Sequence, residues 1–343
     1  MLFQKRKYFQ FSKSNESIRN LKSDFIIKNK ILLQETIKIN RKYKKQKKRV
    51  HCKNCQKKLN KYDFVSFGIK YYICKRCSHV NGAHEDSDNF INFLYKDKKG
   101  KNYSENYMKF YKERVIKIYL PKIKFIEKTL FKNKKRSLNI LDFGCGAGHF
   151  LKACEIRKHF GIGYDTNQTL VDLSKKKLKK NICYLTEIDS FPEIIKNSSF
   201  DVISLIGVLE HLQNPNELLR SFKQSKSQYL FLSLPLFSLS SLVENSNQNL
   251  FPRHLSRGHT HLYTENSINN FIKRFKLRIV GEWWFGSDIS DLYRTLFLRS
   301  KFRDLKIKEK IYKDYFSKVM DKLQTVLDRD KICSEVHLLI RKI

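Results

Sequence analysis

The chain has 343 residues, of which 41% are hydrophobic and 13% aromatic, so it carries enough apolar material for two domains or one large one. This composition excludes a wholly disordered protein. The net charge of +37 would suit nucleic acid or an anionic membrane surface. It comes from 52 lysines and only 18 arginines, however, and because phosphate recognition favours arginine, a lysine-rich background explains the charge better than a polyanionic partner.

Residues 1–50 form a basic arm that we expect to be partly helical or disordered. Apolar residues recur at roughly helical spacing from Ile18 to Ile37, and the arm ends in the lysine- and arginine-rich run 41–49. Contact with nucleic acid or with an anionic membrane is the alternative role for this arm. The first residues lack the apolar stretch of a signal peptide, and no run of 18 apolar residues occurs anywhere. We therefore expect a soluble, cytoplasmic protein.

Residues 51–85 contain four cysteines in two C-x-x-C pairs: Cys52, Cys55, Cys74 and Cys77. Four thiolates in two such pairs suit tetrahedral zinc, and the spacing predicts a closed structural site of the zinc-ribbon kind. Free thiols are the alternative. The other four cysteines lie in apolar or glycine-rich surroundings, which is typical of buried thiols. Residues 86–135 read as a helical linker or cap, with a helix at about 103–131 that Pro121 is expected to kink or divide.

From residue 136 to the end, short apolar runs alternate with amphipathic helices, which predicts an α/β domain with a mostly parallel sheet and helices on both faces. After residue 276 the alternation changes, and residues of about 284–330 are expected to form a helical insert between the last two strands. The predicted strands are Leu138–Phe143, Phe160–Tyr164, Ile182–Leu185, Asp201–Ile206, Tyr229–Leu234, Leu277–Trp283 and Val336–Ile343.

A glycine-rich turn follows the first of these strands. It reads D-x-G-C-G-x-G, from Asp142 through Gly144 and Gly146 to Gly148. Glycines let the backbone turn sharply and let a ligand approach the main chain. Asp165 ends the second strand, where a carboxylate can accept both hydroxyls of a ribose. The dinucleotide fingerprint would need glycine in place of His149, and the signature of a P-loop is absent.

This turn resembles the cofactor loop of class I S-adenosylmethionine-dependent methyltransferases. Residues 200–211 look like the fourth-strand signature of that family, in which an F-D-x-I strand runs into L-E-H. The resemblance covers about residues 136–283 and the terminal strand, and it implies a Rossmann-like sheet whose last strand is antiparallel. It also implies that Glu187 lies near the adenine amino group and that Ile206 packs near the adenosine.

The segment after the fifth strand, residues 253–263, resembles the stretch that faces the methyl acceptor in small-molecule methyltransferases. A base is needed only if the acceptor must lose a proton, and histidine suits that role near neutral pH. His261 and His259 are therefore the candidate catalytic residues, with a positioning role as the alternative for each. A zinc ribbon before such a core resembles sugar and surface-polysaccharide methyltransferases, which implies a sugar, sugar nucleotide or glycan as the acceptor.

Two other functions fit parts of the sequence. The first is base methylation of ribosomal or transfer RNA, which would use the basic arm and the ribbon. The Asn/Asp-Pro-Pro-aromatic motif of exocyclic-amine methylation is missing, however. The second is a catalytically silent binding module, which the intact glycines, Asp165 and His261 argue against.

Overall fold

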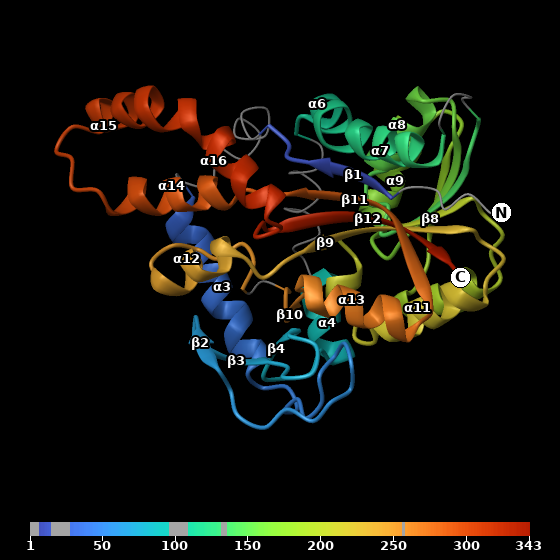
Figure 1. The fold of residues 1–343 in the computed structure, drawn as a ribbon, viewed down its shortest axis with the longest axis horizontal. Coiled ribbons are helices and arrows are strands. Elements are labelled where there is room, and N and C mark those ends of the chain that lie inside the picture. The colour runs from blue at the N-terminus through green and yellow to red at the C-terminus, as the bar shows by residue number, and fades with distance from the viewer. Residues whose placement is uncertain (1–6, 15–27, 96–108, 132–135, 256–257) are drawn as a thin grey trace.

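The computed structural model describes residues 7–14, 28–95, 109–131, 136–255 and 258–343. Its centre is an eight-stranded sheet of order β1-β11-β12-β9-β8-β5-β6-β7, and a smaller sheet of order β10-β4-β3-β2 lies beneath it in Figure 1. Parts of the expected arm and linker, including Ile18, Leu21, Phe25 and the start of the expected helix at 103–108, lie outside the described residues.

The large sheet has the predicted α/β topology. Strands β9, β8, β5, β6 and β7 are mutually parallel, and the terminal strand β12 runs antiparallel between β9 and β11, so the expected mostly parallel sheet is confirmed. Its strands in chain order are β1 (Tyr8–Phe11), β5 (Asn139–Phe143), β6 (Phe160–Asp165), β7 (Ile182–Leu185), β8 (Val202–Ile206), β9 (Tyr229–Pro235), β11 (Leu277–Phe285) and β12 (Glu335–Lys342).

Apolar runs form these strands because both faces of the sheet are covered. Along β9, successive side chains point to opposite faces. Leu230, Leu232 and Leu234 enter the core on one side of the sheet, whereas Phe231 enters the core on the other side. The core beneath Leu232 also takes in Leu219 of helix α11 (Pro215–Gln224).

Helices cover both faces of the large sheet. In Figure 1, α6, α7 and α8 lie above it, and α11 and α13 lie below it. Besides α11, the α-helices of the described chain are α3 (Asn29–Tyr43), α4 (Asp88–Tyr95), α6 (Tyr111–Arg114), α7 (Leu120–Leu130), α8 (His149–Ile156), α9 (Gln168–Lys177), α10 (Phe191–Lys196), α12 (Leu239–Ser246), α13 (Glu265–Arg274), α14 (Asp288–Arg299), α15 (Leu305–Ile311) and α16 (Ser317–Arg329). A π-helical segment, Val115–Tyr119, joins α6 to α7, and Pro121 lies in the first turn of α7, where proline is tolerated.

The chain between β11 and β12 is helical, and it extends beyond the end of β9. Helix α14 packs on α12 and on α16. The buried carboxylate of Asp288 connects this insert to the strand ends, because it accepts hydrogen bonds from Ser238 Oγ at 2.6 Å and from the Ser334 amide at 2.9 Å. Tyr293 packs its ring on Tyr312, with 5.2 Å between ring centroids. These aromatic side chains therefore pack against each other within the insert.

The smaller sheet combines the cysteine-containing segment with a distant part of the chain. Its strands are β2 (Phe64–Ser66), β3 (Ile69–Ile73), β4 (Val80–Gly82) and β10 (His261–Leu262). Helix α3 packs on this sheet through Ile39 and Tyr43, which share a core with Ile69 and Tyr71.

The N-terminal segment also contributes β1, which the sequence did not indicate. β1 pairs in parallel with β11 at the edge of the large sheet. The Trp283 indole nitrogen donates a hydrogen bond to the Ser12 carbonyl at 2.9 Å. Within the described residues, no helix combines the length and the apolar character needed to cross a bilayer.

Candidate functional site

The glycine-rich loop connects the end of β5 to α8 and has an unusual backbone. Gly144, Gly146 and Gly148 have φ values of +66°, +52° and +73°, a region that L-residues with a Cβ rarely adopt. The amides of Gly144 and Cys145 both donate to the Tyr164 carbonyl, at 2.8 and 3.1 Å, which holds the loop against the end of β6. Of the three glycines, Gly144 is exposed, so a ligand can reach the main chain at the start of the loop.

Asp165 and the loop come together as the sequence predicts. One carboxylate oxygen of Asp165 accepts a hydrogen bond from the Gly146 amide at 2.7 Å, and the other accepts from the Asn167 amide at 2.9 Å. Burial raises the pKa of this carboxyl, while these amides oppose the shift. A carboxylate fixed at the end of β6 and beside the glycine loop is suited to bind vicinal hydroxyls.

The other predicted cofactor residues line the same edge of the sheet in different environments. Asp142 is fully buried and accepts a hydrogen bond from Ser204 Oγ at 2.6 Å, and burial raises its pKa to about 7. It therefore joins the ends of β5 and β8. Ile206 is the half-buried last residue of β8, and Glu187 is exposed just after β7. Because β8, β5, β6 and β7 are parallel, these positions lie along the same edge of the sheet as the glycine loop.

Gly144 has no room for a side chain, which gives a direct test of the loop. A Cβ at this position would lie 2.6 Å from Val208 Cγ2. We expect Gly144→Ala to lower the free energy of unfolding by ~2–4 kcal/mol, the sum of positive-φ strain and overpacking. Gly68 has a φ of +74° and faces only the flexible end of Lys44, so Gly68→Ala should show the strain alone, about 1 kcal/mol. Urea unfolding of both variants measures the difference, and equal losses would contradict the close packing at Gly144.

The two histidines predicted to face the acceptor lie in different surroundings. His261, in β10, is completely buried, and its Nδ1 lies 2.8 Å from Nε2 of His79. Burial lowers the pKa of His261 well below its usual value. His259 is half-buried beside His211, with 4.9 Å between ring centroids, and burial lowers its pKa to about 4. Both imidazoles are therefore uncharged at neutral pH.

Two neighbours of these histidines were not singled out from the sequence. His79 contacts His261 across 182 residues of chain, and Glu210 lies in the 3-10 turn that follows β8, with 3% of its surface exposed. Burial raises the pKa of Glu210 to about 8. The L-E-H signature contained Glu210, but only the fold brings it to the loop that carries His259.

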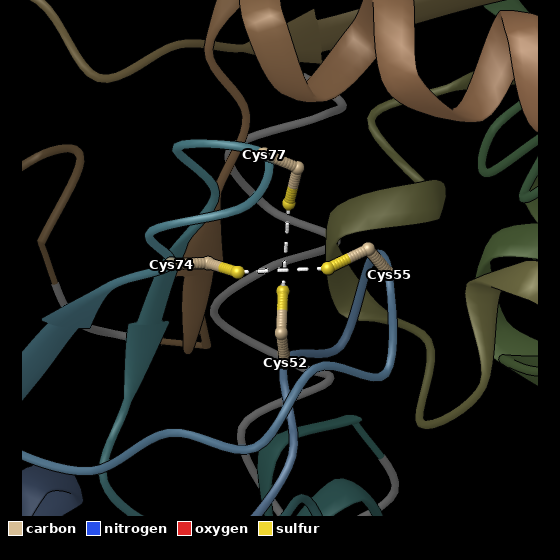
Figure 2. A group of neighbouring side chains, drawn as sticks. All are labelled: Cys52, Cys55, Cys74 and Cys77. Atoms are coloured by element: carbon tan, nitrogen blue, oxygen red, sulfur yellow. Dashed lines mark hydrogen bonds between the residues drawn. The ribbon is translucent and has the colours of Figure 1, made fainter.

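The four cysteines of the N-terminal segment converge on one point (Figure 2). The Sγ atoms of Cys52 and Cys77 are 3.7 Å apart, and those of Cys55 and Cys74 are 3.5 Å apart. These separations are far longer than a disulfide bond. The hydrogen bond with Cys52 lowers the pKa of the Cys77 thiol, which favours its thiolate form. All four side chains are buried.

The segment that carries the cysteines contacts the segment that carries the histidines. β10 pairs with β4, so His261 lies opposite Asn81 in the smaller sheet. The Gly82 amide donates to the Thr260 carbonyl at 2.8 Å. Near the first cysteine pair, the Asn54 side chain donates a hydrogen bond to the carbonyl of Ser267 in helix α13 at 2.9 Å. The position of the histidine loop therefore depends on the folding of the cysteine segment.

A sequence model of the family described as "Methyltransferase domain" matches residues 111–282, which is 172 of the 343 residues. The matched segment contains the glycine loop, Asp165, Glu210 and both histidines of the acceptor loop. No curated protein matches the chain.

Solved structures of methyltransferases share part of the arrangement at low sequence identity. Magnesium protoporphyrin IX methyltransferase from Synechocystis, with bound SAH, is 11% identical with a TM-score of 0.47, and the match covers 75% of this chain and 100% of that one. A SAM-dependent methyltransferase from Archaeoglobus fulgidus is 18% identical with a TM-score of 0.43, covering 69% and 100%. The plantazolicin methyltransferase in complex with SAH is also 18% identical, with a TM-score of 0.45 and coverage of 74% and 93%.

Proposed function

We propose that this chain, which belongs to the methyltransferase-domain family, uses S-adenosylmethionine to methylate a small or medium acceptor of the sugar, sugar nucleotide or glycan class. The observation that carries the cofactor assignment is the contact between the Asp165 carboxylate and the Gly146 amide. It supports the proposal because a carboxylate held beside a glycine-rich turn is suited to bind the ribose of a nucleoside.

We propose that Gly144, Gly146 and Gly148 hold the cofactor against the main chain and that Asp165 binds its ribose. Ile206 and Glu187 flank the adenosine, and Asp142 fixes the start of the loop through Ser204. The sulfonium supplies an activated methyl group, so the protein mainly has to place an acceptor in line with it. The residues of this chain therefore act by binding and orienting.

The acceptor is proposed to bind on the side of His259 and His261. His259 is half-buried, so its imidazole can touch an acceptor, whereas His261 is buried and holds the loop through His79. We therefore propose His259 as the catalytic residue and His261 as a positioning residue. Transfer of labelled methyl groups to nucleotide sugars would support this acceptor class, and transfer only to RNA would contradict it.

We propose that Cys52, Cys55, Cys74 and Cys77 bind one structural zinc ion. A tetrahedron with Zn–S bonds of about 2.3 Å has edges of about 3.8 Å, and the two sulfur pairs at 3.7 and 3.5 Å fit those edges. Four cysteines complete the tetrahedron, so the site would be closed. In this proposal residues 51–85 are the metal module, residues 86–135 connect it, and residues 136–343 are the methyltransferase domain.

Asp165→Ala tests the cofactor assignment. It leaves the ribose hydroxyls without a charged acceptor, which costs ~1.5–3 kcal/mol, so we expect S-adenosylmethionine to bind ~10- to 100-fold more weakly. Asp172→Ala, at an exposed aspartate of α9, is the matched control and should bind normally. Calorimetric titration measures both, and the same affinity in Asp165→Ala as in the original protein would refute the assignment.

A further inference from the structure

Three side chains from two separate segments converge beside the proposed cofactor loop. Glu210 and His211 lie in the short 3-10 turn Leu209–His211 after β8, and His259 lies in the loop between β9 and β10. One potential ligand atom from each of the three lies within 4.8 Å of the others. Two imidazoles and one carboxylate form a donor set that binds divalent transition metals and leaves coordination positions open.

The hydrogen bonding of this group is incomplete. Oε2 of Glu210 and Nδ1 of His259 are both buried, and neither has a hydrogen-bond partner among the described residues. Among the described residues Glu210 forms no ion pair with a lysine or arginine, and His211 Nε2 lies 3.8 Å from its Oε1. Burying a carboxylate and an imidazole nitrogen without partners is costly. A bound cation would satisfy both atoms.

A second group, of two carboxylates and one imidazole, differs in this respect. Glu244, His254 and Asp291 also lie close together. Asp291, however, is paired with Arg253 at 2.8 Å and with Arg294 at 3.3 Å. Glu244 accepts hydrogen bonds from the amides of residues 253–255. The charges of this group are already balanced by the protein.

We propose that Glu210, His211 and His259 bind a divalent transition-metal ion that holds an oxygen atom of the methyl acceptor. The ion would lie next to the cofactor loop, because a Cβ on Gly207 would come within 3.6 Å of Glu210 Oε1 and the neighbouring Val208 packs against Gly144. This inference rests on the proposed function and extends it, since a hydroxyl oxygen becomes the methylated atom.

The chemistry of such a transfer is balanced without a further reactant. The acceptor hydroxyl loses its proton to water, a step that a bound cation favours. The acceptor oxygen forms a bond to the methyl carbon, and the electron pair of the breaking carbon–sulfur bond goes to sulfur. The products are a methyl ether and S-adenosylhomocysteine.

Manganese(II) is the probe for the test, because it prefers oxygen and nitrogen ligands and avoids the cysteine group. Full-length protein, dialysed against citrate to remove weakly held ions, is titrated with Mn²⁺ and followed by electron paramagnetic resonance. We expect one bound Mn²⁺ per chain. Glu210→Gln and His259→Asn should each weaken binding by more than ~10-fold, since even outer-shell partners are worth ~10- to 100-fold. Glu217→Gln, at an exposed glutamate of α11, should leave it unchanged.

Two further measurements separate this inference from the proposed function. Calorimetry with S-adenosylmethionine should give the same affinity in Glu210→Gln and His259→Asn as in the original protein, which also shows that the variants are folded. Methyl transfer to a hydroxyl acceptor should increase when Mn²⁺ is added to the dialysed protein. Absence of bound Mn²⁺, or binding that both variants leave intact, would overturn the cation site even if transfer occurs. Failure to bind S-adenosylmethionine would instead refute the proposed function.

Discussion

Cys77→Ser is expected to release the zinc ion and to abolish methyl transfer, while S-adenosylmethionine still binds. A structural zinc contributes on the order of 10 kcal/mol to the folding of its module. We therefore expect that three remaining thiolates would not hold the two C-x-x-C pairs together. The loss should extend to the acceptor side, because β4 of this module pairs with β10, which carries His261. The glycine loop and Asp165 belong to the large sheet and should be unaffected.

Elemental analysis, calorimetry and a methyl-transfer assay on the same preparation check this result. Cys333→Ser is the matched control, because Cys333 is equally buried but lies far along the chain from the cysteine group, where its Sγ contacts the Glu335 carbonyl. The control should keep one zinc per chain. Full activity in a zinc-free Cys77→Ser protein would show that the module does not support the acceptor loop.

His259→Ala is expected to lower turnover by ~10²–10⁴-fold, with the affinity for S-adenosylmethionine unchanged. The variant removes the imidazole proposed to contact the acceptor, whether it acts on the acceptor directly or through a bound ion. His261→Ala should mainly raise KM, since that side chain is buried and acts by holding the loop.

Steady-state kinetics with a fixed acceptor distinguish these two effects. His51→Ala, which removes an exposed imidazole from the cysteine segment, serves as the control and should keep both parameters. If the double variant at positions 259 and 261 keeps normal kcat and KM, the acceptor binds elsewhere.

The sequence predicted the centre of the large sheet well because the strands there are apolar and buried on both faces. Runs such as residues 229–234 need only their own composition to be recognised, and β9 covers the same stretch, Tyr229–Pro235. Local motifs were equally informative where the chemistry is local. The glycines set the backbone of the turn, and Asp165 follows from its place at the end of the next strand.

Contacts between distant segments could not be predicted in this way. β1 and β10 are short, and each is a strand because a distant segment of the chain pairs with it. The same holds for His79, whose partner His261 is 182 residues away. The group of Glu210, His211 and His259, proposed here to bind a cation, likewise depends on two distant segments meeting.

The structure of the protein crystallised with S-adenosylhomocysteine tests the central claim most directly. The claim predicts density for the nucleoside along Gly144–Gly148, with both ribose hydroxyls within hydrogen-bond distance of the Asp165 carboxylate and the sulfur facing the side of His259. Density for the nucleoside at any other part of the molecule, with the glycine loop and Asp165 free of ligand, would contradict it.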